Sequence, residues 1–390
     1  MIGKEEVMKT RILGRTGIQV SEIGMGCEGL EGKSTEESQR LVDCAMQEGI
    51  AFFDVYTSNP TVRRNLGGAL SRYPREQFVI QGHLCTAWKN GQYCRTRQME
   101  EVKESFEALL TDMGLDFVDV GMIHYVDDQN DYEQVMNGPV LQYAQQLREQ
   151  GTIGCIGIST HNPDIAFLAV ESGFIDVIML SINPAYDMVP ASEDVNILFE
   201  QETFDRVYQG IDPKRDRLYQ TCHNTGVALT VMKAFAGGLL LDERQTPFGC
   251  AMTPVQCISY CLDRPAVASV LGGMASVEEI RASAAYCTAS AAEKDYSPIL
   301  ANAPKRSFDG HCMYCGHCAP CAAGIDIAAV NKYLDLAEAQ GAVPETVQNH
   351  YDLLAHHASE CIRCGSCMRN CPFGTDVIQK MKQAASLFGK

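Results

Sequence analysis

The sequence predicts an α/β fold in two parts, a (β/α)8 barrel (TIM barrel) followed by a small helical domain. Over residues 10–287, eight short apolar runs alternate with segments of helical period. Near the end of the chain, eight cysteines fall into two tight clusters. A chain of 390 residues also exceeds the size at which one hydrophobic core usually stops growing, so two domains are expected.

The eight apolar runs have the length of strands and are apolar throughout, as strands buried on both faces are. Helical patterns lie between them, for example at 35–48, 97–113, 164–172 and 276–286. Parallel strands that are each followed by a helix close into a barrel of roughly 250 residues or more. The predicted strands are 21–26, 51–54, 78–82, 117–124, 153–159, 177–182, 228–232 and 266–271.

The barrel is expected to span residues 1–290, with a linker at 291–305 and the second domain at 306–390. Within that second domain, helical patterns at 325–340, 344–357 and 375–388 separate and follow the cysteine motifs. Segment 186–212 is longer than an ordinary loop and carries acidic and aromatic residues, so we expect it to lie across the barrel mouth.

Composition excludes several classes of protein. Apolar residues make up 46% and charged residues 21% of the chain, as in ordinary soluble proteins. No run of about 18 apolar residues occurs and the first residues carry scattered charges, which argues against a membrane span or signal peptide and for the cytoplasm. A net charge of −17 without a basic stripe excludes nucleic acid as a partner.

Eighteen cysteines in a chain expected in a reducing compartment do not form a disulfide framework. Ten of them, such as Cys44, Cys155, Cys222 and Cys257, are dispersed on apolar segments, where a thiol usually serves as a small buried hydrophobe. The eight clustered cysteines are interpreted as metal ligands.

The later cysteine run reads CIRCGSCMRNCP from Cys361 to Pro372. This spacing is that of bacterial ferredoxins, in which three cysteines hold one 4Fe-4S cluster and the fourth ligates another. The earlier run, CMYCGHCAPC over 312–321, has its first three cysteines at the same two spacings, but its fourth cysteine comes one residue early and lacks the following proline. The second domain is therefore predicted to be a helical, ferredoxin-like module with two clusters.

The predicted crossing assigns four cysteines to each cluster. Zinc is the alternative, because pairs of Cys-x2-Cys also build tetrahedral sites. Four closely spaced cysteines close less easily around one ion than around a cubane. The clusters serve either electron transfer or structural support. The expected ligand sets are Cys312, Cys315, Cys318 and Cys371 for one cluster and Cys361, Cys364, Cys367 and Cys321 for the other.

In a (β/α)8 barrel, chemistry is expected at the C-terminal ends of the strands. Six polar side chains converge there in this sequence: Asp54, His83, His124, Ser159, Asn183 and Lys233.

Several stretches give this chain a recognisable family pattern: RILGRTGIQVSEIGMG (11–26), FFD (52–54), VDVGMIH (118–124), IGIST (156–160), VMKAFAGG (231–238) and RPAVASVLGGMASVEEI (264–280). On these residues the chain resembles the aldo/keto reductase superfamily, and specifically its bacterial branch with a C-terminal 4Fe-4S domain. The resemblance extends over nearly the whole chain.

The resemblance implies a catalytic tetrad of Asp, Tyr, Lys and His, in which the Tyr protonates a carbonyl oxygen while a nicotinamide delivers hydride. Asp54 and His124 stand at matching positions, whereas Asn59 replaces the Tyr and His83 replaces the Lys. Asn is not a general acid, and an imidazole with an ordinary pKa of about 6.5 is not permanently charged. Tyr56 is the nearby candidate for the missing proton donor.

The resemblance also implies a nicotinamide cofactor. Gly273 and Glu279 stand where the family often has a basic residue that grips the 2′-phosphate, which favours NAD(H) over NADP(H). The implied cofactor-binding residues are Ser159, Asn183, Met232, Lys233, Phe235, Gly237, Gly238, Gly273, Met274, Ser276 and Glu279.

Three functions follow as hypotheses. The first is an oxidoreductase of an anaerobe that passes electrons between its clusters and a small molecule at the barrel mouth, with a redox partner protein such as a ferredoxin. The small molecule would be NAD(H) and a carbonyl or hydroxy compound. The second is a non-redox lyase or isomerase in which Asp54, His83 and His124 do acid/base work and the clusters are structural. The third is an electron carrier or interaction subunit with an inactive barrel.

Overall fold

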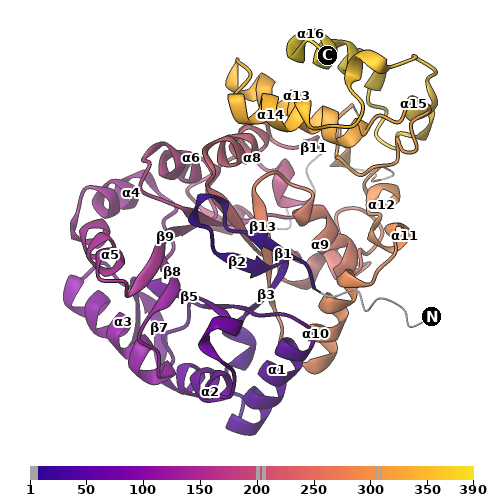
Figure 1. Ribbon diagram of the computed structural model, residues 1–390. Helices are drawn as coiled ribbons and strands as arrows, with labels where there is room; N and C mark the ends of the chain where they lie inside the picture. Colours follow the sequence, from indigo (N-terminus) through magenta and orange to yellow (C-terminus); the bar gives the residue numbers. More distant parts are fainter. Residues whose placement is uncertain (1–7, 199–202, 204–207, 302, 304–305, 308–309) are drawn as a thin grey trace.

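The computed structural model describes residues 8–198, 203, 208–301, 303, 306–307 and 310–390. Eight parallel strands form a closed barrel, helices surround it, and a smaller helical domain lies on one side (Figure 1). All eight predicted strands are confirmed, with ends that differ by a few residues at most. In chain order they are β3 (Ile23–Gly26), β4 (Phe52–Val55), β5 (Val79–Leu84), β8 (Val118–Ile123), β9 (Ile153–Thr160), β10 (Val177–Ser181), β12 (Ala228–Met232) and β13 (Val267–Gly273).

The helices around the barrel begin and end at residues with capping chemistry. Ser34 and Glu37 form a reciprocal capping box at the start of α1, and Pro occupies the first turn of several others. Gly114 and Gly226 end α3 and α8 in the left-handed conformation. These helices are α1 (Thr35–Gln47), α2 (Pro60–Leu70), α3 (Met99–Met113), α4 (Gln129–Met136), α5 (Pro139–Glu149), α6 (Pro163–Glu171), α8 (Pro213–Thr225), α9 (Pro254–Leu262) and α10 (Val277–Ala284).

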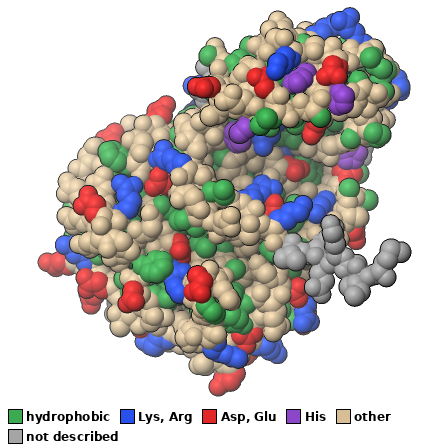
Figure 2. Space-filling view, viewed as in Figure 1, with side chains coloured by type: hydrophobic (Ala, Val, Ile, Leu, Met, Phe, Trp, Pro, Cys, Tyr) green, Lys and Arg blue, Asp and Glu red, His purple; other side chains and the backbone are tan. Residues whose placement is uncertain are grey.

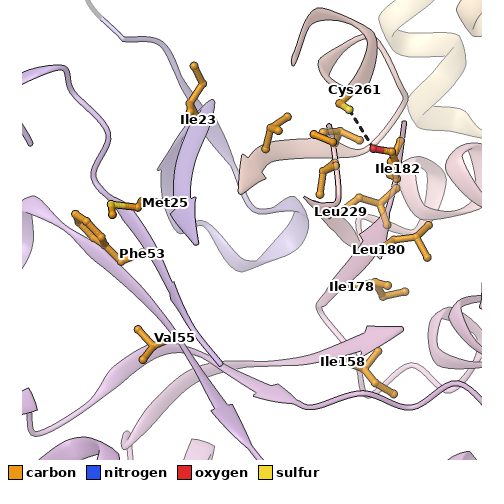
Figure 3. Close-up of a cluster of buried hydrophobic side chains, with 14 of the residues drawn as sticks. Ile23, Met25, Phe53, Val55, Ile158, Ile178, Leu180, Ile182, Leu229 and Cys261 are labelled. Carbon is orange, nitrogen blue, oxygen red and sulfur yellow. Dashed lines mark hydrogen bonds between the residues drawn. The ribbon is translucent and has the colours of Figure 1, made fainter. Parts of the chain in front are cut away.

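The barrel strands are buried on both faces. Alternate side chains point outward against the helices and inward into the barrel. Phe53, Ile178 and Leu180 belong to the large core between strands and helices, part of which Figure 3 shows. Phe52 and Met179 belong to a second core inside the barrel. The hairpin of β1 (Thr10–Ile12) and β2 (Gln19–Ser21) adds Leu13 and Val20 to this inner core, so it closes the N-terminal end of the barrel.

The dispersed cysteines are mostly part of this packing. Seven of the ten are buried, among them the four that the sequence singled out, Cys44, Cys155, Cys222 and Cys257. Within the described residues, no helix combines the length and the apolar character that crossing a membrane requires. Charges of both signs are interspersed over the face shown in Figure 2.

A short hairpin follows β5 and was not among the predicted elements. It consists of β6 (Thr86–Lys89) and β7 (Gln92–Arg95), joined by Asn90 and Gly91. Both joining residues have positive φ, 53° and 76°, which is the two-residue type I′ turn that Asn-Gly favours. The hairpin brings Tyr93 to the barrel mouth.

Residues 291–305, expected as a linker, contain two short helices, α11 (Ala291–Lys294) and α12 (Ser297–Ala301). Tyr296 and Leu300 are buried there. The helical patterns of the second domain form α13 (Ile327–Gln340), α14 (Glu345–Asp352) and α16 (Val377–Phe388), with the short α15 (Ser366–Asn370) between the last two. The core of this domain is a separate apolar cluster that includes Val330, Leu334 and Met381.

Hydrogen bonds join the second domain to the barrel. Arg264, which is buried between α9 and β13, donates from Nη2 to the Met313 carbonyl at 2.9 Å. The Tyr296 hydroxyl lies 3.0 Å from the same carbonyl and 2.8 Å from an Asp263 carboxylate oxygen. The Asn224 amide donates to the Leu336 carbonyl at 3.3 Å, which links α8 to α13. The first cysteine run is therefore fixed to the barrel wall.

Segment 186–212, expected to lie across the mouth, begins inside the wall of the barrel. Asp187 is fully buried and accepts hydrogen bonds from the hydroxyls of Tyr219 and Tyr260, while Arg215 lies 3.5 Å away. Burial raises the pKa of Asp187, and the arginine opposes that rise. Residues 199–202 and 204–207 of this segment lie outside the described residues, so the expected covering of the mouth stays a prediction.

Candidate active site and cluster-binding loops

A cavity of about 670 Å³ opens at the C-terminal ends of the barrel strands. Its size is that of a site for a cofactor or drug-sized ligand. Asp54, Tyr56, His83 and His124, the four expected catalytic residues, all line it. Nine of the eleven expected cofactor-binding residues line it as well: Ser159, Met232, Lys233, Phe235, Gly237, Gly238, Gly273, Met274 and Glu279.

The remaining two expected cofactor-binding residues hold backbone in place. Asn183 donates from its amide to the Lys233 carbonyl at 2.8 Å, and its amide oxygen accepts from the backbone of Ala185 and Tyr186. Ser276 caps the N-terminus of α10 by accepting from the Glu279 backbone. Neither residue lines the cavity. Their polar side chains are used on nearby backbone groups instead, where they fix the loop conformation.

Four side chains form a continuous hydrogen-bonded run along the cavity wall. The Tyr93 hydroxyl lies 2.5 Å from His124 Nε2, and His124 Nδ1 lies 2.7 Å from His83 Nδ1. His83 Nε2 lies 2.9 Å from Asp54 Oδ1, which also accepts from the Gln81 amide at 2.6 Å. Asp54, Gln81 and His83 are buried, whereas Tyr93 is 38% exposed. We call this run the Tyr93–Asp54 relay.

The relay has one consistent assignment of protons when both imidazoles are neutral and Asp54 is ionised. His83 donates from Nε2 to Asp54 and accepts at Nδ1 from His124, whose Nε2 then accepts from the Tyr93 hydroxyl. Burial lowers the pKa of His124 well below its ordinary value, and nearby His83 and Arg97 lower it further. His124 is therefore neutral at pH 7 and cannot act as a charged acid, although it can pass a proton on.

Two tyrosines stand beside the relay. The ring of Tyr56 stacks on His124, with centroids 5.8 Å apart and planes 7° from parallel. Burial raises the pKa of both Tyr56 and Tyr93 to about 12. Asn59, which the sequence resemblance places at the position of the catalytic tyrosine, caps α2 and donates to Glu31 at 2.6 Å, and it does not line the cavity.

Sequence reasoning missed Tyr93, Glu28 and His161. The Asn-Gly turn after a predicted strand was the signal for the hairpin that carries Tyr93. His161 lines the cavity directly after β9, and its Nδ1 lies 2.9 Å from an Asp127 carboxylate oxygen. Glu28 lines the cavity after β3, and burial raises the pKa of its carboxyl group.

The eight clustered cysteines gather in two groups. Cys312, Cys315, Cys318 and Cys371 line one small cavity, and Cys321, Cys361, Cys364 and Cys367 line another. Each run thus sends its fourth cysteine to the other group, which is the grouping that the predicted cross-ligation requires. Among the described side chains, no three His, Cys, Asp or Glu converge closely enough to hold a single metal ion, as zinc would need.

The two Cys-x2-Cys-x2-Cys loops share one backbone conformation. Tyr314 and Gly316 have positive φ in the first loop, and Arg363 and Gly365 have positive φ at the corresponding positions of the second. Turns of this kind point successive backbone N–H groups into a concavity that suits anions and iron–sulfur centres. Four thiols around each concavity fit a 4Fe-4S cluster, so these residues are the ones that would hold it.

Comparison with known proteins decides the family. The model of the aldo/keto reductase family matches residues 22–253, which is more than half of the chain. The chain belongs to the aldo/keto reductase family. A 4Fe-4S binding-domain model matches residues 355–375, the segment that contains the later cysteine run. The chain is therefore an aldo/keto reductase with a 4Fe-4S ferredoxin-type domain.

Relatives of this aldo/keto reductase are distant. An uncharacterised oxidoreductase, YqkF of Bacillus subtilis, is 22% identical over 70% of this chain and 89% of its own length. The NADH-specific methylglyoxal reductase of Escherichia coli is 22% identical over 44% of this chain and 58% of its own. The aldo-keto reductase AKR11C1 from Bacillus halodurans, a solved structure, shares the fold with a TM-score of 0.56 at 20% identity, covering 74% of this chain and 94% of its own.

The relay predicts that Tyr93→Phe slows turnover. Removing the hydroxyl cuts the relay at its exposed end, and acid–base groups of this kind typically contribute about 10²–10⁴ in rate. We expect kcat to fall by about 10² while KM changes little. Tyr56→Phe is the matched control, since Tyr56 stacks on the same imidazole. A loss in Tyr56→Phe with none in Tyr93→Phe would assign the proton to Tyr56 instead.

The grouping of thiols predicts which cluster each variant damages. Cys371→Ala removes one thiol from the group of Cys312, Cys315 and Cys318, so that cluster should be lost or converted while the other remains. Cys321→Ala is the reciprocal variant and should damage the cluster held by Cys361, Cys364 and Cys367. Iron and sulfide analysis with electron paramagnetic resonance of the dithionite-reduced variants distinguishes the two. Identical spectra for both variants would refute the crossing.

Proposed function

We propose that this chain is an iron–sulfur oxidoreductase that interconverts a carbonyl and a hydroxy compound at the barrel mouth and exchanges electrons between that site and two 4Fe-4S clusters. The Tyr93–Asp54 relay is the observation that carries the proposal. Carbonyl reduction consumes two electrons and two protons, which arrive together as hydride and one proton when a nicotinamide takes part. A buried relay with a partly exposed end supplies protons to such a reaction.

The relay performs this task without the usual tyrosine and lysine pair. His83 takes the position of the lysine on Asp54, at 2.9 Å, and Tyr93 approaches His124 from the hairpin instead of from the loop after β4. In the reducing direction, a relay residue that lines the cavity gives its proton to the substrate oxygen, and that proton is replaced along the relay from Tyr93 at the exposed end; His124, His83 and Asp54 are the relay residues that line the cavity. A substrate oxygen in the cavity therefore lies within reach of the relay.

The cavity wall supports NAD(H) over NADP(H). Glu279 accepts from the Ala275 backbone at 2.7 Å, so its carboxylate is held at the start of α10, where it lines the cavity. A carboxylate there repels a 2′-phosphate and can accept a ribose hydroxyl. The name of one relative, the NADH-specific methylglyoxal reductase, agrees with this preference.

The clusters fit the proposal by electron count. Each 4Fe-4S cluster transfers one electron, so two together hold the pair that a carbonyl requires. Nicotinamide transfers its two electrons as hydride, so direct exchange with the clusters needs a group that handles both one and two electrons; otherwise the clusters feed the substrate by single electrons, or the hydride chemistry occurs separately from them. The first cysteine loop, which would hold one cluster, is anchored to the barrel through the Met313 carbonyl, which Arg264 and Tyr296 contact. This attachment supports electron exchange between the two parts of the chain.

Visible absorbance of the anaerobic holoprotein tests the proposal. We expect NADH to bleach the cluster absorbance, NADPH to need at least about 10-fold higher concentration, equivalent to about 1.4 kcal/mol, and a carbonyl substrate to restore the colour of reduced protein. Glu279→Arg should reduce the difference between the concentrations of NADH and NADPH that bleach the clusters. Glu278→Arg is the matched control, because Glu278 does not line the cavity.

Two outcomes would contradict the proposal. Turnover of a substrate with no change in cluster absorbance and no need for nicotinamide would identify a lyase or isomerase with structural clusters. Binding of neither nucleotide and no response to any carbonyl compound would identify an inactive barrel.

A further inference from the structure

We propose that the surface around the second cysteine loop docks a small acidic one-electron carrier protein. This inference rests on the proposed electron transfer through the clusters and names the partner that exchanges the electrons. The surface consists of Ile362, Arg363, Cys364, Met368 and Arg369, and we call it the carrier face.

The two cysteine loops correspond residue by residue, which allows their surroundings to be compared. Both have positive φ at the residue before the second cysteine and at the glycine after it. Met313 of the first loop therefore corresponds to Ile362 of the second, and Tyr314 corresponds to Arg363.

In the first loop, the barrel and α13 cover these two residues. Met313 is 1% exposed and its carbonyl accepts from Arg264 at 2.9 Å. The Tyr314 hydroxyl lies 2.7 Å from an Asp335 carboxylate oxygen and 3.4 Å from the Gln220 amide of α8. The first loop thus uses this side to attach to the rest of the chain.

In the second loop, the corresponding side is open to solvent. Ile362 is 65% exposed and Met368 is 38% exposed, and the Cys364 ligand beside them is exposed as well. An exposed aliphatic side chain between two cluster ligands is what a small electron-transfer interface needs at its centre.

Charge indicates the kind of partner. The chain carries a net charge of −17, yet residues 361–371 contain two arginines and no acidic residue. Arg363 and Arg369 are exposed. Arg369 also lies 3.0 Å from the Ser366 hydroxyl and 3.4 Å from the Cys364 carbonyl, which fixes its guanidinium beside the ligand loop. A local positive site on an acidic protein attracts an acidic partner to this place.

The step at this face is a single electron transfer. One electron leaves the reduced carrier and enters the oxidised cluster held by Cys361, Cys364, Cys367 and Cys321, with no bond formed and no proton moved. Two such encounters supply the pair of electrons that one carbonyl reduction consumes.

The test uses anaerobic holoprotein and a bacterial two-cluster ferredoxin of acidic charge as the probe. Arg363→Asp reverses the charge at a left-handed position that Asp tolerates, and Arg363→Asn removes the charge at equal backbone cost. Arg40→Asp on α1, an exposed arginine on the opposite side of the barrel from the second domain in Figure 1, is the matched control. Binding is measured by calorimetry at low and high salt, and cluster reduction by stopped-flow absorbance.

We expect Arg363→Asp to weaken ferredoxin binding and slow cluster reduction by at least about 10-fold, and Arg363→Asn to have a smaller effect. Arg40→Asp should bind ferredoxin as tightly as the wild type does. Raised salt should weaken ferredoxin binding by the wild type until it approaches that of Arg363→Asp. Reduction by dithionite, iron content and sulfide content should stay unchanged in all variants. If Arg363→Asp loses its cluster, ferredoxin binding and cluster reduction are compared between the wild type and the variants Arg363→Asn and Ile362→Asp.

Equal binding by the wild type and the Arg363 variants would overturn the inference, as would a homodimer formed through this face in size-exclusion chromatography with light scattering. The result also separates this inference from the proposed function. Binding and reduction at this face without any cluster response to nicotinamide or carbonyl compounds would leave the carrier face standing and end the proposed function. Substrate-dependent cluster oxidation without ferredoxin binding would support the proposed function and end the carrier-face inference.

Discussion

The contact between His83 and Asp54 determines what the barrel mouth can do. Asp54 is buried at the end of β4 and accepts from two neutral donors, the Gln81 amide and His83 Nε2. This contact fixes which nitrogen of His83 carries the proton, and it therefore fixes the tautomer of His124 and the role of Tyr93. A lysine on the same carboxylate would supply a permanent charge and lower the pKa of a neighbouring tyrosine. The imidazole supplies a route for protons instead, and the pKa of Tyr93, about 12, stays high.

The two halves of the chain are joined so that the first cysteine loop belongs structurally to the barrel. Arg264 is buried beneath this loop and contacts the ring of Tyr260, whose hydroxyl donates to Asp187 inside the wall. A buried arginine needs such partners, because an uncompensated charge in the interior costs several kcal/mol. The second loop has the same backbone and none of this cover at Ile362. One cluster site thus faces the barrel, and the other faces the solvent.

Local patterns in the sequence predicted the strands, the helices and the thiols, because each depends on neighbouring residues: continuous apolar runs, helical periodicity and cysteine spacing. The positions of Asp54, His83 and His124 followed from the rule that strand ends meet at the mouth of a barrel. Tyr93 did not follow, since it reaches His124 only through the type I′ hairpin inserted after β5. Asn183 stands at a strand end as expected, but its amide is used on the Lys233 carbonyl, a contact that composition cannot reveal.

The most direct test of the relay is nitrogen-15 NMR of the imidazoles in the oxidised, anaerobic protein. The account predicts that both rings are neutral at pH 7, with His83 protonated at Nε2 and His124 protonated at Nδ1. Asp54→Asn should disturb the His83 tautomer and, through it, that of His124. An imidazolium at His124, or the reversed arrangement with His83 protonated at Nδ1 and His124 protonated at Nε2, would contradict the proton route along the relay.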